Sequence, residues 1–164
     1  SEEILVCSGY GFADSLSASA SGRPILLVGD ALSDEQKAFL KDINSIKFAI
    51  IGGYRTIGSA TEDWLNSTGN TTRVFGADRY ETSVAIAKYF FNKPNSVVLS
   101  YGDNFPDGLC GGVLAERRGA PMILINENNL DYAREYVKAN SIKDLLVLGG
   151  SRLITDAAIS IISD

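Results

Sequence analysis

Two aspartates stand four residues apart in the segment Gly102-Asp-Asn-Phe-Pro-Asp107, where an aliphatic run meets a helical pattern. Paired carboxylates carry out glycoside hydrolysis, so Asp103 and Asp107 have the side chains for acid and base chemistry. The segment recurs as Gly9-Tyr-Gly-Phe-Ala-Asp14, which keeps the second aspartate but not the first. A carboxylate kept in both copies is typical of a helix cap, which contributes about 1 kcal/mol. Capping is therefore favoured, and a doubly wound enzyme or nucleotide-binding domain that uses Asp103 and Asp107 is the alternative.

Histidine is absent from the sequence. This excludes the Ser-His-Asp and Cys-His arrangements and removes the usual general base near neutral pH. Cys7 and Cys110 are too few for a four-thiolate zinc site, and we interpret them as buried free thiols, with a disulfide between them as the alternative. The pattern at Gly9 and Gly11 has Asp14 where a dinucleotide-binding loop has its third glycine. We therefore expect no catalytic residue, no cofactor and no metal.

A glycine pair and an arginine follow two aliphatic runs, in Gly52-Gly53-Tyr-Arg55 and Gly149-Gly150-Ser-Arg152. Such glycines turn the chain tightly and leave N–H groups open, while a guanidinium suits phosphate or carboxylate. The alternative is that the glycines serve the turn alone. Because the net charge is −5, an anionic ligand requires local basic patches, to which Arg73 and Arg79 are added. The candidate ligand-binding residues are Arg55, Arg152, Gly52, Gly53, Gly149, Gly150, Arg73 and Arg79.

Composition narrows the function classes. Hydrophobic residues make up 45% and charged residues 21% of the 164-residue chain, which is typical of a globular protein. The negative net charge argues against a nucleic-acid-binding protein, which is normally basic. No apolar run approaches the roughly 20 residues that span a bilayer, and no signal peptide is seen at Ser1. We therefore expect neither a nucleic-acid partner nor membrane insertion.

The elements that must position these residues alternate along the chain. Unbroken aliphatic runs predict parallel strands buried on both faces, and helical patterns with start signals lie between them. The fold class is therefore α/β, with tandem small open parallel sheets and helices on both faces, as in Rossmann or flavodoxin-like units. Capping-box spacing is found at Ser33 with Gln36, Ser59 with Glu62 and Asp78 with Glu81. Predicted strands cover residues 4–7, 25–28, 48–51, 73–75, 97–100, 122–125 and 145–148; predicted helices cover residues 12–20, 33–43, 59–65, 78–91, 130–139 and 155–162, and another begins near Pro106.

The chain contains one unit written twice. Glycine, phenylalanine, aspartate and leucine of residues 9–16 recur in register in residues 102–109, and Asn44-Ser-Ile-Lys47 recurs letter for letter as Asn140-Ser-Ile-Lys143. Repetition of this kind marks a module that is used in multiples, which favours binding over catalysis.

A polar segment, residues 66–72, predicts a turn at the boundary between the copies. We therefore predict a partial first copy at residues 1–71 and a complete second copy at residues 72–164. Two roles stay open for residues 73–91, which either open the second sheet or close the first.

Several motifs together cover nearly the whole chain. They are Arg73-Val-Phe-Gly-Ala-Asp-Arg-Tyr-Glu-Thr-Ser83, Gly102-Asp-Asn-Phe-Pro-Asp-Gly-Leu109, the strands that begin at Pro24 and Pro121, and the glycine pairs that end an aliphatic strand. In this combination they resemble the cell wall binding repeat 2 family of Gram-positive bacteria, especially clostridia. The resemblance implies a non-catalytic anchor that binds an anionic secondary wall polymer without a covalent bond, as part of a larger surface protein or autolysin.

The resemblance also implies partners and a location. The polymer would be an anionic cell-wall polysaccharide or a teichoic-acid-like polymer, and the protein would be extracellular, on the cell wall, although this chain shows no signal peptide. Members usually carry the unit three times beside an effector domain such as an amidase. One and a half copies therefore imply self-association or packing with a third repeat.

Overall fold

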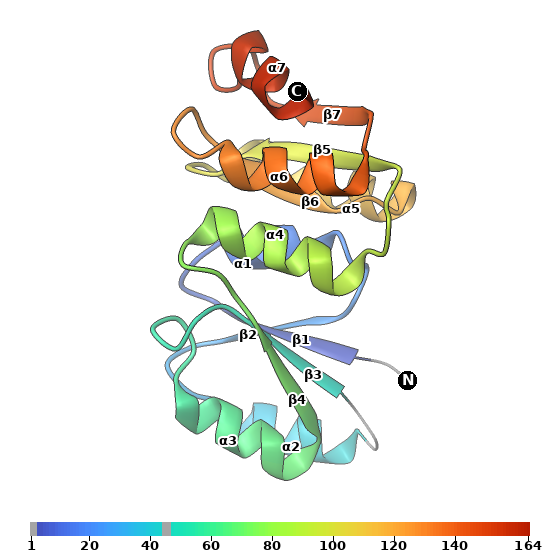
Figure 1. Ribbon diagram of the computed structural model, residues 1–164. Coiled ribbons are helices and arrows are strands. Elements are labelled where there is room, and N and C mark those ends of the chain that lie inside the picture. Colours follow the sequence, from blue (N-terminus) through green and yellow to red (C-terminus); the bar gives the residue numbers. More distant parts are fainter. Residues whose placement is uncertain (1–2, 44–46) are drawn as a thin grey trace.

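The computed structural model describes residues 3–43 and 47–164, in which parallel strands alternate with helices (Figure 1). The first copy of the Asn-Ser-Ile-Lys motif falls largely on residues 44–46, outside the described residues. The elements are β1 (Glu3–Ser8), α1 (Ala13–Ser19), β2 (Ile25–Val28), α2 (Asp34–Asp42), β3 (Lys47–Ile51), α3 (Ser59–Thr68), β4 (Asn70–Val74), α4 (Arg79–Phe90), β5 (Ser96–Tyr101), α5 (Pro106–Arg118), β6 (Met122–Ile125), α6 (Asp131–Asn140), β7 (Asp144–Leu148) and α7 (Asp156–Ser163).

The first four strands form sheet A, in the order β2-β1-β3-β4 and all parallel. Alternate residues of each strand point to opposite faces, and both faces are covered. Phe48 and Ile50 pack with Leu40 of α2 on one face, whereas Ala49 packs with Ile86 of α4 on the other. The aliphatic runs are therefore strands buried on both sides, and the predicted α/β class is confirmed.

The remaining three strands form sheet B, in the order β6-β5-β7 and again parallel. One face carries α5, where Ala115 packs against Val98. The other face carries α6 and α7, where Val137 and Ile162 pack against Leu99. Sheet B thus repeats the first three strands of sheet A, and the position that β4 holds beside β3 has no counterpart beside β7 in the described part of the chain.

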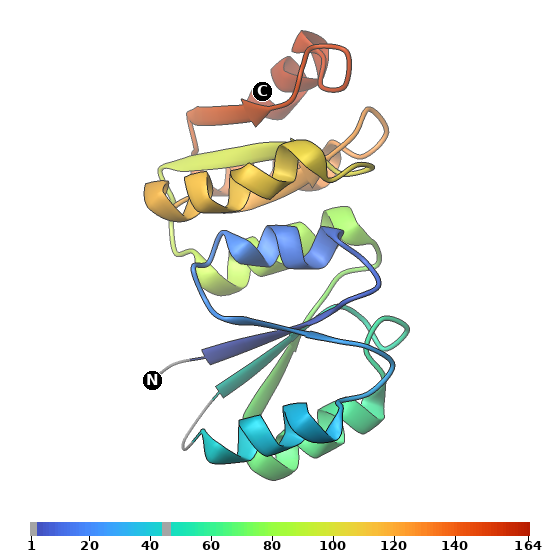
Figure 2. The ribbon, with the colours of Figure 1, turned by 180° about the vertical axis from the view of Figure 1, so that it is seen from behind.

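Helices α1 and α4 lie between the two sheets, and the edge strand β6 of sheet B rests on them (Figures 1 and 2). An edge strand needs partners for its free backbone groups. The buried Ser83 of α4 provides one, because its Oγ accepts a 3.0 Å hydrogen bond from the Leu124 N–H. Helices α1 and α5 also contact closely, since a Cβ on Gly112 would lie 1.8 Å from Ser19 Oγ. The two copies are therefore joined through shared packing.

Strand β4 crosses the boundary that the sequence predicts between residues 71 and 72. It pairs with β3 in sheet A, in the register Ile51 with Val74, so this segment closes the first sheet. The predicted turn at residues 66–72 is wrong, because α3 continues to Thr68 and β4 begins at Asn70. The open edge of β3 provides backbone partners for this polar segment. The division of the chain into repeats at residues 71 and 72 remains a prediction.

Helix starts match the sequence only in part. Ser33 forms the predicted capping box with Gln36, and Asp78 caps α4 by accepting from the Tyr80 and Glu81 N–H groups. The cap predicted at Ser59 is wrong, since the N-cap of α3 is Gly58.

The caps predicted at Asp14 and Asp107 are also wrong. The N-cap residues of α1 and α5 are Phe12 and Phe105, so both aspartates lie inside the first turn. Their carboxylates are consequently directed to other partners. The predicted place of Pro106 in the first turn of α5 is confirmed.

Candidate functional site

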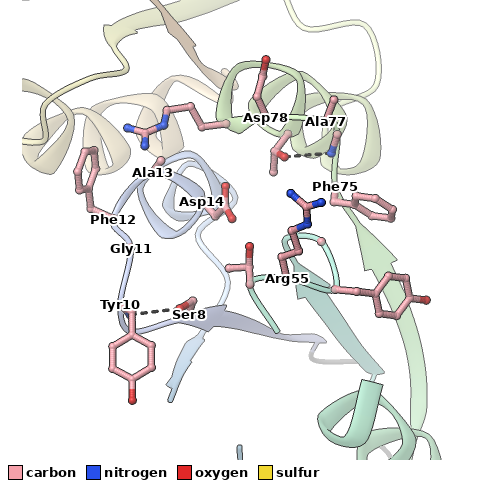
Figure 3. A pocket seen from close by; sticks show the side chains of 16 residues that line it. Ser8, Tyr10, Gly11, Phe12, Ala13, Asp14, Arg55, Phe75, Ala77 and Asp78 are labelled. Carbon is pink, nitrogen blue, oxygen red and sulfur yellow. Dashed lines mark hydrogen bonds between the residues drawn. The ribbon is translucent and has the colours of Figure 1, made fainter. Parts of the chain in front are cut away.

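A cleft of about 650 Å³ opens at the carboxyl ends of β1, β3 and β4 (Figure 3). The chain winds in opposite directions on the two sides of the gap between β1 and β3, and in open parallel sheets ligands bind at such a point. Its residues come from the loop after β1, the loop after β3 and the segment that joins β4 to α4. They are Ser8, Tyr10, Gly11, Phe12, Ala13, Asp14, Gly53, Tyr54, Arg55, Thr56, Phe75, Gly76, Ala77, Asp78, Arg79 and Thr82.

Arg55 lies in the centre of this cleft, between Asp14 and Phe75 (Figure 3). It is exposed and follows the turn that the glycine pair makes. Gly52 has a φ of +117°, a conformation that favours glycine. The Gly52 N–H donates a 3.0 Å hydrogen bond to the Val74 carbonyl, so it is used inside the protein and is not open for a ligand.

Asp14 lies against the Gly52 turn, whose positive φ already favours glycine. Its Oδ2 lies 3.0 Å from the place where a Cβ of Gly52 would stand. Burial raises the pKa of the Asp14 carboxyl, and the positive charge of Arg79 partly opposes this shift.

Burial, with the Asp14 charge as a smaller cause, also raises the pKa of Cys7 to about 12, so this thiol stays protonated at neutral pH. Cys7 is buried and free as predicted; Cys110 is free but exposed, which the sequence interpretation missed.

Arg79 reaches the cleft from the first turn of α4. Its Nη1 donates a 2.8 Å hydrogen bond to the Gly102 carbonyl, and its guanidinium lies 5.5 Å from the centre of the Phe12 ring. A guanidinium has five N–H donors, so one bond to a carbonyl leaves others for an anion. Arg79 therefore joins the two sheets and presents positive charge to the cleft at the same time.

Arg73 occupies a different place. Its Nη2 forms a 3.1 Å ion pair with Glu62, its Nη1 donates to the Gly52 carbonyl at 2.9 Å, and its side chain is almost fully buried. The guanidinium stacks 4.1 Å from the centre of the Tyr54 ring. Arg73 is thus not among the residues that line the cleft; it lies beneath one of them.

The second copy repeats the turn in sheet B. Gly149 has a φ of +123°, and a Cβ there would lie 3.1 Å from Asp107 Oδ2, as at Gly52 and Asp14. Gly150 and Arg152 follow at the end of β7, which has no outer strand in the described part of the chain. The structure therefore brings together Gly53, Arg55 and Arg79, with Gly52 in the adjoining turn. It places Gly149, Gly150 and Arg152 at a separate, one-sided position.

Asp103 is bound within the protein. It accepts hydrogen bonds from the Tyr80 hydroxyl at 2.5 Å and from the Asn126 side-chain amide at 2.9 Å. These donors, Tyr80 first, lower the pKa of the Asp103 carboxyl and keep it ionised. Among the described residues, no group of three or more Cys, Asp and Glu side chains is placed to hold a metal ion. An ionised carboxylate with both oxygens occupied favours a structural role for Asp103.

Sequence reasoning missed the aromatic residues of the cleft. Tyr54 and Phe75 contact each other edge to face, with ring centres 6.3 Å apart, and both are about half exposed. The difference between Tyr54 and Ser151 at the equivalent place in the second copy was the available signal. Phe75 gave none, because only the pairing of β3 with β4 brings it to Tyr54.

A comparison with protein families now adds to this geometry. The profile of the family described as cell wall binding domain 2 (CWB2) matches residues 73–159, more than half of the chain. The chain belongs to this family. It is thus a member of the cell wall binding repeats of Gram-positive surface proteins, as the motifs indicated.

Two curated relatives come from Bacillus subtilis strain 168. The N-acetylmuramoyl-L-alanine amidase LytC is 24% identical over 159 residues, which is 93% of this chain and 32% of the amidase. The amidase enhancer is 27% identical over 141 residues, which is 83% of this chain and 19% of the enhancer. This chain therefore spans a third or less of either relative.

Two solved structures share the fold over 99% of this chain. Cwp6 from Clostridium difficile has a TM-score of 0.83 at 25% identity, and this chain covers 27% of it. Cwp8 from the same organism has a TM-score of 0.82 at 22% identity, and this chain covers 29% of it.

Proposed function

We propose that this chain binds an anionic secondary wall polymer non-covalently, in the cleft between Arg55 and Arg79, and that it acts as an extracellular, non-catalytic wall anchor within a larger surface protein or autolysin. The observation that supports the proposal most is the cleft itself. Two arginines from different elements face one hollow at the ligand-binding end of a parallel sheet, in a member of a cell wall binding family.

The charges in the cleft favour guanidinium contacts over helix N–H contacts. At the start of α4, the Asp78 carboxylate accepts from the Tyr80 and Glu81 N–H groups, and Glu81 accepts from the Ala77 N–H at 2.6 Å. The protein's own carboxylates thus occupy the donors that would otherwise bind an anion. Arg55 and Arg79 are the cations that line the cleft. The whole chain has a net charge of −5, so these two side chains provide the local positive charge that an anionic ligand needs.

The absence of catalysis is part of the same proposal. Asp103 is ionised and bound by Tyr80 and Asn126, and Asp107 lies against the Gly149 turn. Neither carboxylate lines the cleft that holds the arginines. These contacts support structural roles, so we assign any amidase or other activity to other parts of the parent protein.

Wall binding can be tested by co-sedimentation with bacterial wall sacculi, before and after acid removes their anionic polymers. Wild type should sediment only with untreated sacculi. Arg55→Glu should lower the bound fraction about tenfold, because it replaces attraction by repulsion at the point where the anionic polymer is expected to bind. Arg117→Glu makes the same charge change on an exposed site at the end of α5 and is the matched control. Equal binding by Arg55→Glu and Arg117→Glu, or binding that survives stripping, would contradict the proposal.

The edge of β7 that has no neighbouring strand supports the proposal of a second partner. We propose that another repeat packs there, as the third repeat that the family resemblance implies. Residues 48–51 of β3 are fully buried beside β4, whereas residues 145–148 of β7 are only partly buried. On the helices, Leu109 of α5 is 58% exposed, but Leu16, its counterpart on α1, is 8% exposed because it packs on the next copy. A strand like β4 would pair with β7 and complete a second cleft with Arg152. The sheet and first helix of a following repeat would cover Leu109, as sheet B and α5 cover Leu16.

A further inference from the structure

The two copies differ at the residue between the glycine pair and the arginine. The first copy has Tyr54, which is 57% exposed at the rim of the cleft, and the second has Ser151. Both turns keep the same glycine conformation, so the turn itself does not require an aromatic ring. Tyr54 and Phe75 together leave two neighbouring aromatic rings about half exposed beside a cleft, which is a more informative feature than a single exposed apolar side chain.

The Tyr54 ring is held in a fixed orientation. The Arg73 guanidinium lies 4.1 Å from its centre, and Arg73 is itself fixed by Glu62 and by the Gly52 carbonyl. Phe75 meets the ring edge to face. Because one face of Tyr54 rests on a buried cation, the ring loses little entropy when a ligand covers the exposed remainder.

The Phe75 ring packs against the backbone of Gly53. A Cβ at Gly53 would lie 3.5 Å from Phe75 Cδ2, so the Phe75 ring packs directly over the backbone of the turn. Phe75 is still 46% exposed. The two rings, in edge-to-face contact, therefore leave adjoining apolar surfaces exposed, and Arg55 lies beside Phe75 in the cleft (Figure 3).

An apolar ring surface beside a guanidinium matches a particular ligand chemistry. The C–H groups on one face of a pyranose ring carry slight positive charge and pack on the negative face of an aromatic ring. A carboxylate or phosphate on the same sugar would reach Arg55. A chain of alditol phosphates has the charge but lacks the flat C–H face.

We propose that Tyr54 and Phe75 bind a pyranose ring, and that the polymer recognised by the cleft is an anionic polysaccharide with its charged group on or next to that ring. This inference rests on the proposed function, which it deepens by selecting one polymer class. The second copy, with Ser151, has no such ring surface at its turn. Sugar recognition is therefore assigned to the first copy.

The test compares two soluble polymers by isothermal titration calorimetry. Polygalacturonate has pyranose rings that carry carboxylates, and long-chain polyphosphate has charge without a sugar. Wild type should prefer polygalacturonate. Tyr54→Ala should weaken polygalacturonate binding about tenfold and leave polyphosphate binding unchanged, because it removes the stacking surface and keeps the cations Arg55 and Arg79. Tyr54→Phe should retain wild-type affinity for polygalacturonate.

Controls separate this inference from the proposed function. Ser151→Ala should change neither affinity, and Arg55→Ala should weaken binding of both polymers. The inference is overturned if wild type does not bind polygalacturonate, if it prefers polyphosphate, or if Tyr54→Ala weakens both polymers equally. The sedimentation experiment then decides whether the anchor function still stands. If wild type binds untreated sacculi and Arg55→Glu does not, the anchor function is retained. Loss of this dependence on Arg55 as well would remove the proposed function itself.

Discussion

At the scale of single residues, Asp14 connects the cleft to the fold. Its carboxylate fills the space that Gly52 leaves, and it shares the cleft with Arg55 and Arg79. The titratable and charged side chains around it are Cys7 on β1, Arg55 after β3 and Arg79 on α4. Since burial raises the pKa of Asp14, its ionisation costs stability in the folded state.

The pH dependence of stability follows from this shift. Between the ordinary aspartate pKa and the raised pKa of Asp14, the folded protein keeps a proton that the unfolded chain has lost, so the free energy of unfolding falls as pH rises. Asp14→Asn cannot titrate and should gain stability relative to wild type as the pH increases from about 3 to about 7. Urea unfolding at several pH values measures this difference. Asp63→Asn on the exposed side of α3 is the control, and identical pH profiles for wild type and Asp14→Asn would refute the assignment.

At the scale of elements, α4 is the connection between the sheets. Its residues Ile86 and Val84 pack against sheets A and B respectively. Three polar contacts fix it on sheet B: Ser83 to Leu124, Tyr80 to Asp103 and Arg79 to Gly102. Hydrophobic packing thus supplies the area, and the hydrogen bonds set the register between α4 and the ends of β5 and β6.

Two buried tyrosines predict different stability changes when the hydroxyl is removed. Tyr80→Phe removes a donor to the ionised Asp103 and should destabilise the protein by about 2 kcal/mol. Tyr136→Phe removes a buried hydroxyl that has no hydrogen-bond partner among the described residues, so it should be neutral or stabilise by up to about 1 kcal/mol. Both values come from urea unfolding at neutral pH. A loss of stability in Tyr136→Phe comparable to that in Tyr80→Phe would show that the two hydroxyls do not differ as described.

Strand β4 shows what element-level sequence reasoning could and could not find. The aliphatic runs predicted six of the strands, because burial on both faces leaves a clear signature. The strand predicted at residues 73–75 overlaps only the end of β4, which begins at Asn70. The sequence Asn70-Thr-Thr-Arg-Val74 has no such signature, since it lies at the edge of sheet A and is largely exposed. Its place is decided by the backbone groups of β3. For the same reason the cleft was only half predicted: Arg55 and Arg79 were found from local motifs, but Tyr54 meets Phe75 only through this pairing.

At the scale of the whole molecule, the two sheets are unequally complete. Sheet A has four strands, and sheet B has three within the described residues. No described helix is both long and apolar enough to cross a membrane. The partly buried strand β7 and the exposed Leu109 and Val113 of α5 are apolar surfaces of this half that no other part of the described chain covers.

A longer chain tests whether sheet B accepts a fourth strand. Residues 69–91 can be appended a second time after Asp164, so that a second β4 and α4 follow α7. We expect slower amide hydrogen exchange at residues 145–148 and a higher Tm, because β7 gains a partner on its open side. The same extension with proline at the second copies of Thr71 and Thr72 is the control, since proline cannot complete the ladder. Equal exchange in the two extended chains would show that β7 does not pair in this way.

The cleft takes residues from both sides of the predicted repeat boundary. Residues 8–56 supply one wall, and residues 75–82 supply the other. A single repeat would therefore contain two half-sites and no whole one, so polymer-binding valence would follow the number of junctions between repeats. Each added repeat contributes one more junction, and weak contacts at successive junctions on one polymer chain multiply into avidity. Residence time on the wall would then be set by the number of repeats in the protein, without any change in the chemistry of a single cleft.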